Sequence, residues 1–181
     1  MHRRVLGFTL IELIITLIIT VILIVIAVPS FRTITLSNKL TTTASDIVGA
    51  INLARMEAVK RNSNTQLCSD STSNNSTDAL GTLCGTQAGA VVALAGNPPA
   101  AVQVRAGAVG LAAPIELTGN LVAIRFSSQG LGHLVSSDAP FTGLIADVST
   151  TSLSTDNHRC INMTAGSILV TTKRSTACPT P

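Results

Sequence analysis

Residues 8–28 read FTLIELIITLIITVILIVIAV, and this stretch decides what kind of protein the chain can be. It carries one charged residue, Glu12, and consists mainly of Ile, Leu and Val. As an α-helix it would be about 31 Å long, enough to cross a bilayer core of about 30 Å. Residues 1–7, MHRRVLG, hold two arginines, which favour a cytoplasmic location for this end. We therefore expect one membrane-spanning helix, with most of the chain exported.

An ordinary secretory signal is the alternative interpretation of this apolar stretch. Such a signal ends in a cleavage site with small residues, and Ala27-Val28-Pro29-Ser30 fits that pattern poorly because Pro29 falls at the cut. Glu12 also needs an explanation, since an ionisable side chain inside a membrane helix costs at least about 2.5 kcal/mol and by default has a partner or a role. A carboxylate that only reaches the lipid head groups is the simpler alternative for Glu12.

The run Gly7-Phe8-Thr9-Leu10-Ile11-Glu12-Leu13 resembles the prepilin signature of type IV pilins and type II secretion pseudopilins. The resemblance implies that a prepilin peptidase cuts after Gly7 and methylates the new amine of Phe8. It also implies that Glu12 pairs with the N-terminal amine of a neighbouring subunit, so that Phe8 and Glu12 serve filament assembly. Pro29 falls where this family commonly kinks the helix.

The helical pattern continues beyond the apolar run. Apolar residues recur at spacings of three and four, as on one face of a helix, at Leu40, Ala44, Ile47, Ile51, Ala54 and Ala58. We expect one long helix from about residue 8 to about residue 62. Its ending, Leu53-Ala54-Arg55-Met56-Glu57-Ala58-Val59-Lys60-Arg61, resembles that of the GspH/FimT group, the minor pilins and H-type minor pseudopilins.

The helical period is absent after residue 64, where short Val-, Ile- and Leu-rich runs alternate with Gly, Pro and Asn turns. These runs predict strands at 66–68, 90–94, 102–105, 114–117, 121–127, 132–135, 144–148, 159–163 and 168–172. The expected fold is α+β and pilin-like, with the long N-terminal helix packed on a small antiparallel β-sheet domain. Its parts are a leader (1–7), a transmembrane helix (8–28), the periplasmic half of the helix (29–63) and a periplasmic β-rich head (64–181).

Four cysteines, Cys68, Cys84, Cys160 and Cys178, indicate disulfides in an oxidising compartment. Of the three connectivities, we favour the local pairs Cys68–Cys84 and Cys160–Cys178, each worth roughly 3 kcal/mol in the chain-entropy model. Metal binding is the alternative. We expect no metal, because there is no CxxC and His158 is the one histidine near a cysteine in sequence.

Composition and motifs argue against catalysis and against a nucleic-acid-coating protein. The net charge is +3 and aromatic residues make up 2% of the chain, too little for broad phosphate or base binding. Neither a GxSxG nucleophile elbow nor a P-loop occurs. We expect no enzyme activity and no cofactor.

The resemblance implies a structural subunit of a type IV pilus or type II secretion pseudopilus, in the tip or initiation complex. Implied partners are the prepilin peptidase, other major and minor pilins or pseudopilins, and the inner-membrane assembly platform. The implied location is the bacterial inner membrane, with the C-terminal domain in the periplasm. One alternative is a DNA-binding minor pilin that uses Arg159, Lys173 and Arg174. Another is an uncleaved, membrane-anchored periplasmic binding protein.

Overall fold

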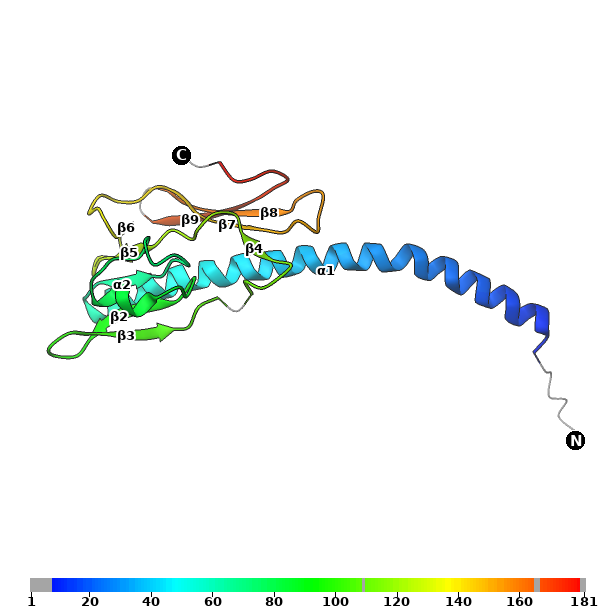
Figure 1. Ribbon diagram of the computed structural model, residues 1–181, viewed down its shortest axis with the longest axis horizontal. Coiled ribbons are helices and arrows are strands. Elements are labelled where there is room, and N and C mark those ends of the chain that lie inside the picture. Colours follow the sequence, from blue (N-terminus) through cyan, green and yellow to red (C-terminus); the bar gives the residue numbers. More distant parts are fainter. Residues whose placement is uncertain (1–7, 109, 165–166, 180–181) are drawn as a thin grey trace, which may run out of the picture. The chain divides into compact units, whose positions relative to one another are not determined.

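The computed structural model describes residues 8–108, 110–164 and 167–179. The chain divides into two compact units after Leu36, and the helix α1 (Leu10–Arg61) runs through the division. The first unit contains α1 up to Leu36. The second, called here the globular unit (Ser37–Pro181), contains the rest of α1 and every other element (Figure 1). A long N-terminal helix with antiparallel sheets is the α+β, pilin-like fold that the sequence predicts.

The part of α1 inside the globular unit presents one buried face. All six residues of the predicted apolar face are at most 1% exposed. The four alanines on this face let the sheet backbone approach the helix closely: Ala44, Ala50, Ala54 and Ala58. The Thr65 hydroxyl uses this proximity, since it donates to the Ala54 carbonyl at 2.6 Å. The helix is thus the core element of the globular unit.

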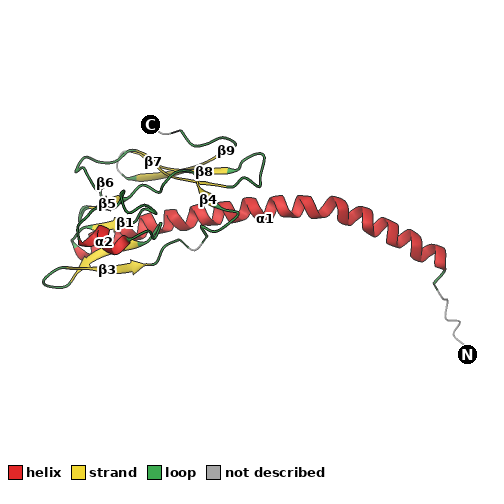
Figure 2. Cartoon of the chain, viewed as in Figure 1, coloured by secondary structure: helices red, strands yellow, loops and turns green. Residues whose placement is uncertain are grey.

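Two antiparallel sheets pack on α1 and make up the predicted antiparallel β-sheet domain (Figure 2). The first sheet has the order β3-β2-β1-β5-β6, and the second has the order β4-β7-β8-β9. In Figure 1, β2 and β3 lie below α1 and β7 to β9 lie above it. The strand bounds are β1 Thr65–Leu67, β2 Val91–Ala95, β3 Ala100–Arg105, β4 Glu116–Leu117, β5 Ile124–Phe126, β6 Gly132–Leu134, β7 Gly143–Ser149, β8 His158–Thr164 and β9 Ile168–Arg174.

Each predicted strand has a counterpart, but the run at 121–127 is much shorter than expected. Strand β5 begins only at Ile124, because the backbone before it is used elsewhere. The Leu121 amide donates to the Asp70 carboxylate at 2.8 Å, and the Val122 amide donates to the Ile145 carbonyl of β7 at 2.9 Å. The chain crosses here from the second sheet to the first, so this backbone is not free to extend β5.

A short helix, α2 (Ala79–Cys84), was not predicted from the sequence. Asp78 caps it, accepting a hydrogen bond from the Gly81 amide at 3.1 Å. The helix covers the face of the first sheet that points away from α1, and it forms a small second core with the Cys68–Cys84 disulfide, Leu80, Ala90 and Val92. Six residues are too few to show a helical period, so only the Asp78 cap could have signalled α2.

The packing of α2 leaves no room for a side chain at Gly81. Gly49 is the matched control position, because a side chain there meets no other atoms. A Cβ on Gly81 would lie 1.8 Å from the Ser76 carbonyl oxygen, whereas one on Gly49, on an exposed face of α1, would meet nothing within 4 Å. We expect Gly81→Ala to lower the free energy of unfolding by about 1–3 kcal/mol, because the backbone must shift. Gly49→Ala should raise it by up to about 1 kcal/mol, since alanine has the higher helix propensity.

The measurement is urea unfolding of the detergent-solubilised chain, followed by far-ultraviolet circular dichroism because the protein contains neither Trp nor Tyr. Equal stability of the Gly81→Ala variant and the unsubstituted protein would contradict the close approach of α2 to residue 76.

Candidate functional site

The start of α1 holds Glu12 in a defined position. Thr9 precedes the helix, and its hydroxyl oxygen accepts a hydrogen bond from the Glu12 amide at 3.3 Å. The same hydroxyl lies 3.5 Å from Glu12 Oε2, to which it donates. Thr9 therefore caps the helix N-terminus, where the helix dipole also favours the negative charge of Glu12. The Glu12 side chain is exposed, and its carboxylate contacts Thr9, the residue that follows Phe8.

Beyond this cap, α1 presents an uncovered apolar surface. Every large apolar side chain from Leu10 (76% exposed) to Val28 (45% exposed) has about half or more of its surface free. Among the described residues, α1 is the one helix that is long enough and apolar enough to span a membrane. A patch of this size is not left in water, so a bilayer or other apolar helices must cover it.

The structure places some of the other predicted processing and assembly residues and leaves one outside the described part of the chain. Gly7 lies outside the described residues, and Phe8 is exposed at the end of the described chain. Pro29 lies inside α1, which continues through it, and the Thr33 hydroxyl donates to the Pro29 carbonyl at 3.1 Å. The kink at Pro29 remains a prediction.

Arg159 does not belong to a DNA-contacting surface, which corrects the expectation. It is 1% exposed and lies between β8 and α1. Its guanidinium donates to the Thr41 hydroxyl (3.2 Å), to the Ser37 hydroxyl (3.0 Å) and carbonyl (3.4 Å), and to the carbonyls of Asp156 (2.6 Å) and His158 (3.0 Å). Burial lowers the pKa of this guanidinium, and the Asp156 charge opposes the shift. Arg159 fastens the second sheet to the helix and has no donor left for a phosphate.

Lys173 and Arg174, the other two candidate DNA contacts, are exposed at the end of β9. Neither forms an ion pair with any described residue. Lys173 is the register partner of Arg159 on β8, and Arg174 is that of His158, so the two strands bring all three basic residues together in space. Exposure separates their roles, because Lys173 and Arg174 are exposed and Arg159 is buried against the helix.

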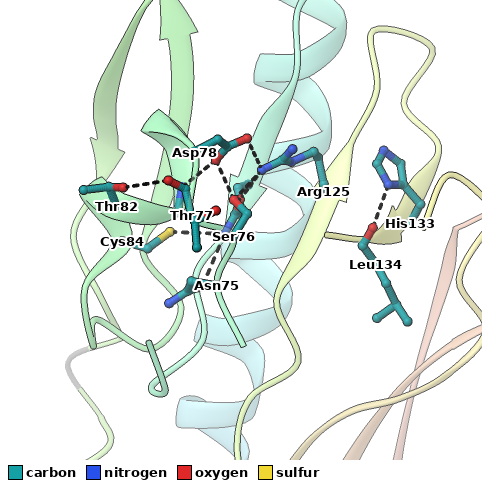
Figure 3. Close-up of polar contacts among 11 residues, drawn as sticks. Asn75, Ser76, Thr77, Asp78, Thr82, Cys84, Arg125, His133 and Leu134 are labelled. Carbon is teal, nitrogen blue, oxygen red and sulfur yellow. Dashed lines mark hydrogen bonds and ion pairs between the residues drawn. The ribbon is translucent and has the colours of Figure 1, made fainter. Parts of the chain in front are cut away.

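A second polar cluster surrounds Arg125, on β5 (Figure 3). Its Nη2 donates to Asp78 Oδ2 (2.8 Å), to the Ser76 hydroxyl (2.7 Å) and to Gln66 Oε1 (2.8 Å). Burial acts to raise the pKa of the Asp78 carboxyl group, but hydrogen bonds from Ser76 and the Gly81 amide and the Arg125 charge outweigh it and lower that pKa. The buried Asn75 side chain donates to three carbonyls of the adjoining loop. This cluster orders the loop that leads into α2.

Both disulfides connect the local pairs that the sequence favoured, Cys68–Cys84 and Cys160–Cys178. The second pair lies beside the buried Asp147, whose carboxylate accepts a hydrogen bond from the Cys178 amide at 3.0 Å. Nδ1 of His158 lies 2.8 Å from the same carboxylate. Asp147 and the two sulfurs are close enough to hold a metal ion, but the sulfurs are bonded to each other. The arrangement instead fastens the C-terminal segment to the second sheet.

These features define a class: a subunit with a capped, acid-bearing apolar helix that continues into an α+β globular unit, as in type IV pilins and pseudopilins. Two family models match the chain. The prokaryotic N-terminal methylation motif matches residues 2–28, and the type II transport protein GspH model matches residues 43–167. No curated protein and no solved structure matches the chain significantly.

The GspH match covers more than half of the chain, which therefore belongs to the GspH family of the pilin and pseudopilin superfamily. It is a minor pilin or pseudopilin subunit, and the family is structural rather than enzymatic.

The internal role of Arg159 predicts a large loss of stability on its removal. Arg159→Met should lower the free energy of unfolding by about 2–4 kcal/mol, because buried carbonyl and hydroxyl groups lose charged donors. Lys39→Met is the matched control, since Lys39 is exposed on α1 and forms no ion pair among the described residues. It should change stability by less than about 0.5 kcal/mol in the same urea unfolding experiment. Similar effects from the two substitutions would contradict the burial of Arg159.

The lowered pKa of Asp78 predicts an acid-dependent contribution to stability. An unfolded Asp titrates near pH 3.9, so the folded state holds the Asp78 proton more weakly than the unfolded state does. The contribution of the Asp78 charge is therefore complete above about pH 5, and it declines as the pH falls through the lower folded pKa. Asp78→Asn retains a good helix cap and removes the charge.

We expect the stability difference between Asp78→Asn and the unsubstituted protein to be largest above about pH 5 and to shrink towards pH 2 in urea unfolding. Asp138→Asn, at an exposed position with no ion pair in the described part of the chain, is the control. A difference for Asp78→Asn that stays constant with pH would show that its charge does not stabilise the fold.

Proposed function

We propose that the chain is processed after Gly7, that the new N-terminus is N-methylated Phe8, and that the mature protein assembles into a filament through Glu12. The helix cap formed by Thr9 supports this, because Thr9 directly follows the new N-terminus and its hydroxyl contacts the Glu12 carboxylate. The methylation-motif match over residues 2–28 supports processing by a prepilin peptidase.

The physical case for Glu12 comes from its surroundings. The carboxylate occupies the first turn of a helix whose next 16 positions, 13–28, are uncharged. When other helices or lipid cover this surface, the carboxylate loses water and needs a compensating charge. The N-terminal amine of an adjacent subunit supplies it, since each subunit carries both groups at the same end. This pairing also aligns neighbouring helices in a common register.

We propose that the subunit first resides in the inner membrane with its globular unit in the periplasm. It is then incorporated into the tip or initiation complex of a filament. Its partners are other pilins or pseudopilins and the membrane assembly platform. The filament is a type IV pilus or a type II secretion pseudopilus. The description of the matched family as a type II transport protein supports measuring protein secretion alongside pili.

DNA binding receives less support than the filament role. With Arg159 internal, two exposed cations remain at the end of β9, and two cations neutralise about two phosphates. The uncleaved membrane-anchored binding protein is the alternative from another class, and it predicts an N-terminus upstream of Phe8. Mass spectrometry of the purified chain separates it from the proposal.

The decisive variant is Glu12→Gln, which keeps a polar side chain beside Thr9 and removes the charge. In cells whose own copy of the gene is replaced by this variant, we expect at least about a tenfold loss of assembled filaments and of the secretion or surface pili that depend on them, since an unpaired buried amine costs more than 1.4 kcal/mol. Sheared filaments and secreted protein are quantified by immunoblot.

Glu116→Gln provides the matched control, because Glu116 is an exposed acid on β4 in the globular unit. It should assemble normally. Normal assembly of the Glu12→Gln variant, at equal membrane levels, would rule out the proposed pairing, and an N-terminus at Met1 would support the anchor alternative.

A further inference from the structure

Strand β9 leaves one long edge of the second sheet open. It is the last strand in the order β4-β7-β8-β9, so its backbone pairs with β8 on one side and with no described strand on the other. Its seven residues span about 23 Å. The sheet's opposite edge, β4, has two residues, and edge strand β6 of the first sheet has three. Short edges are a common protection against unwanted pairing, and β9 lacks this protection.

The side chains of β9 have the same order on both faces. On the face towards α1, the side chains are, in order, Leu169, Thr171 and Lys173. On the face away from α1, they are Ile168, Val170, Thr172 and Arg174. Each face thus runs from an apolar residue through threonine to a cation. Ile168 is 60% exposed and Val170 is 42% exposed, and they are the large apolar side chains of the second sheet that the structure leaves open.

A groove runs beside this edge on the side of α1. Its volume is about 310 Å³, and Thr171 and Lys173 of β9 line one wall while Ala44 and Val48 of α1 line the other. A strand added next to β9 could place alternate side chains into the groove and the others on the outer face, as in binding by strand addition.

The charges of β9 define which strand would fit. Lys173 and Arg174 have no acidic partner in the described residues, whereas Arg105, at the end of the other long edge strand β3, pairs with Asp46 of α1. Ile168 to Thr172 carry no charge that would repel an incoming strand. Directly opposed side chains of adjacent strands interact, and opposite charges favour the pair. A complementary strand therefore carries carboxylates at one end and apolar residues at the other.

We propose that the open edge of β9 binds an extended, acid-bearing segment of a neighbouring filament subunit of another kind, with its carboxylates beside Lys173 and Arg174. This contact rests on the proposed function, because a filament supplies the neighbour. In addition to the pairing of Glu12 between the helices, the subunit would then have a docking site on its globular unit. The charge pattern of β9 would select which neighbour binds there.

The experiment places a photo-crosslinking amino acid at Thr172 of the full chain, in cells that assemble the filament. We expect a product with a different pilin or pseudopilin subunit, mapped by mass spectrometry to a segment that contains Asp or Glu. Lys173→Glu with Arg174→Glu should reduce its yield by about fivefold or more, and replacing the mapped carboxylate by Lys should restore it. Lys39→Glu, a reversal at an exposed cation of α1, should leave the yield unchanged.

A product with DNA, with lipid or with a second copy of this chain would overturn the proposal, as would a yield that is insensitive to charge reversal. Absence of a product in cells whose filaments assemble and require Glu12 would overturn the β9 contact and leave the proposed function intact. Filaments that assemble equally well with Glu12→Gln would instead remove the proposed function on which the contact rests.

Discussion

One helix has to satisfy two environments, and the rest of the protein follows from this constraint. From Leu10 to Val28, α1 exposes large apolar side chains around its whole circumference, so its covering must come from a membrane or from other chains. From Leu40 onwards the same helix has one buried face, which its own sheets cover. A subunit built in this way cannot complete its burial alone. Insertion and assembly are the two solutions that the physics allows.

The globular unit contains few charged residues, and several of them order irregular stretches of backbone. Charged residues make up 12% of the chain, and several of those in the globular unit are directed inward. Arg159 holds β8 against α1, Arg125 and Asp78 order the loop before α2, and Asp147 holds the C-terminal segment beside its disulfide. Because each of these charged groups is hydrogen-bonded, the contacts fix particular chain crossings that apolar packing leaves unspecified. The exposed, unpaired cations of β9 contrast with this pattern.

Local features were predictable from the sequence to the extent that they were periodic. The limits of α1, its buried face and the positions of the strands follow from spacings of three to four residues and from alternation. Helix α2 was missed because six residues give no period, and the polar residues before it resemble a loop. The division into two sheets could not be predicted from the sequence, because it depends on hydrogen bonds of Leu121 and Val122 to residues far away in sequence. The disulfide pairs were favoured by closeness in sequence, and the structure has the same pairs.

The sequence by itself determined the apolar helix, the acid near its start and the family, because these depend on residues adjacent along the chain. Only the tertiary structure decided which basic residues face inward. Arg159 and Lys173 are neighbours on β8 and β9, yet Arg159 meets Ser37 and Thr41 while Lys173 reaches solvent. Asp46 on α1 likewise pairs with Arg105 on the sheet edge. A charge is buried or exposed according to what the fold brings opposite it, and those partners lie 59 to 122 residues away.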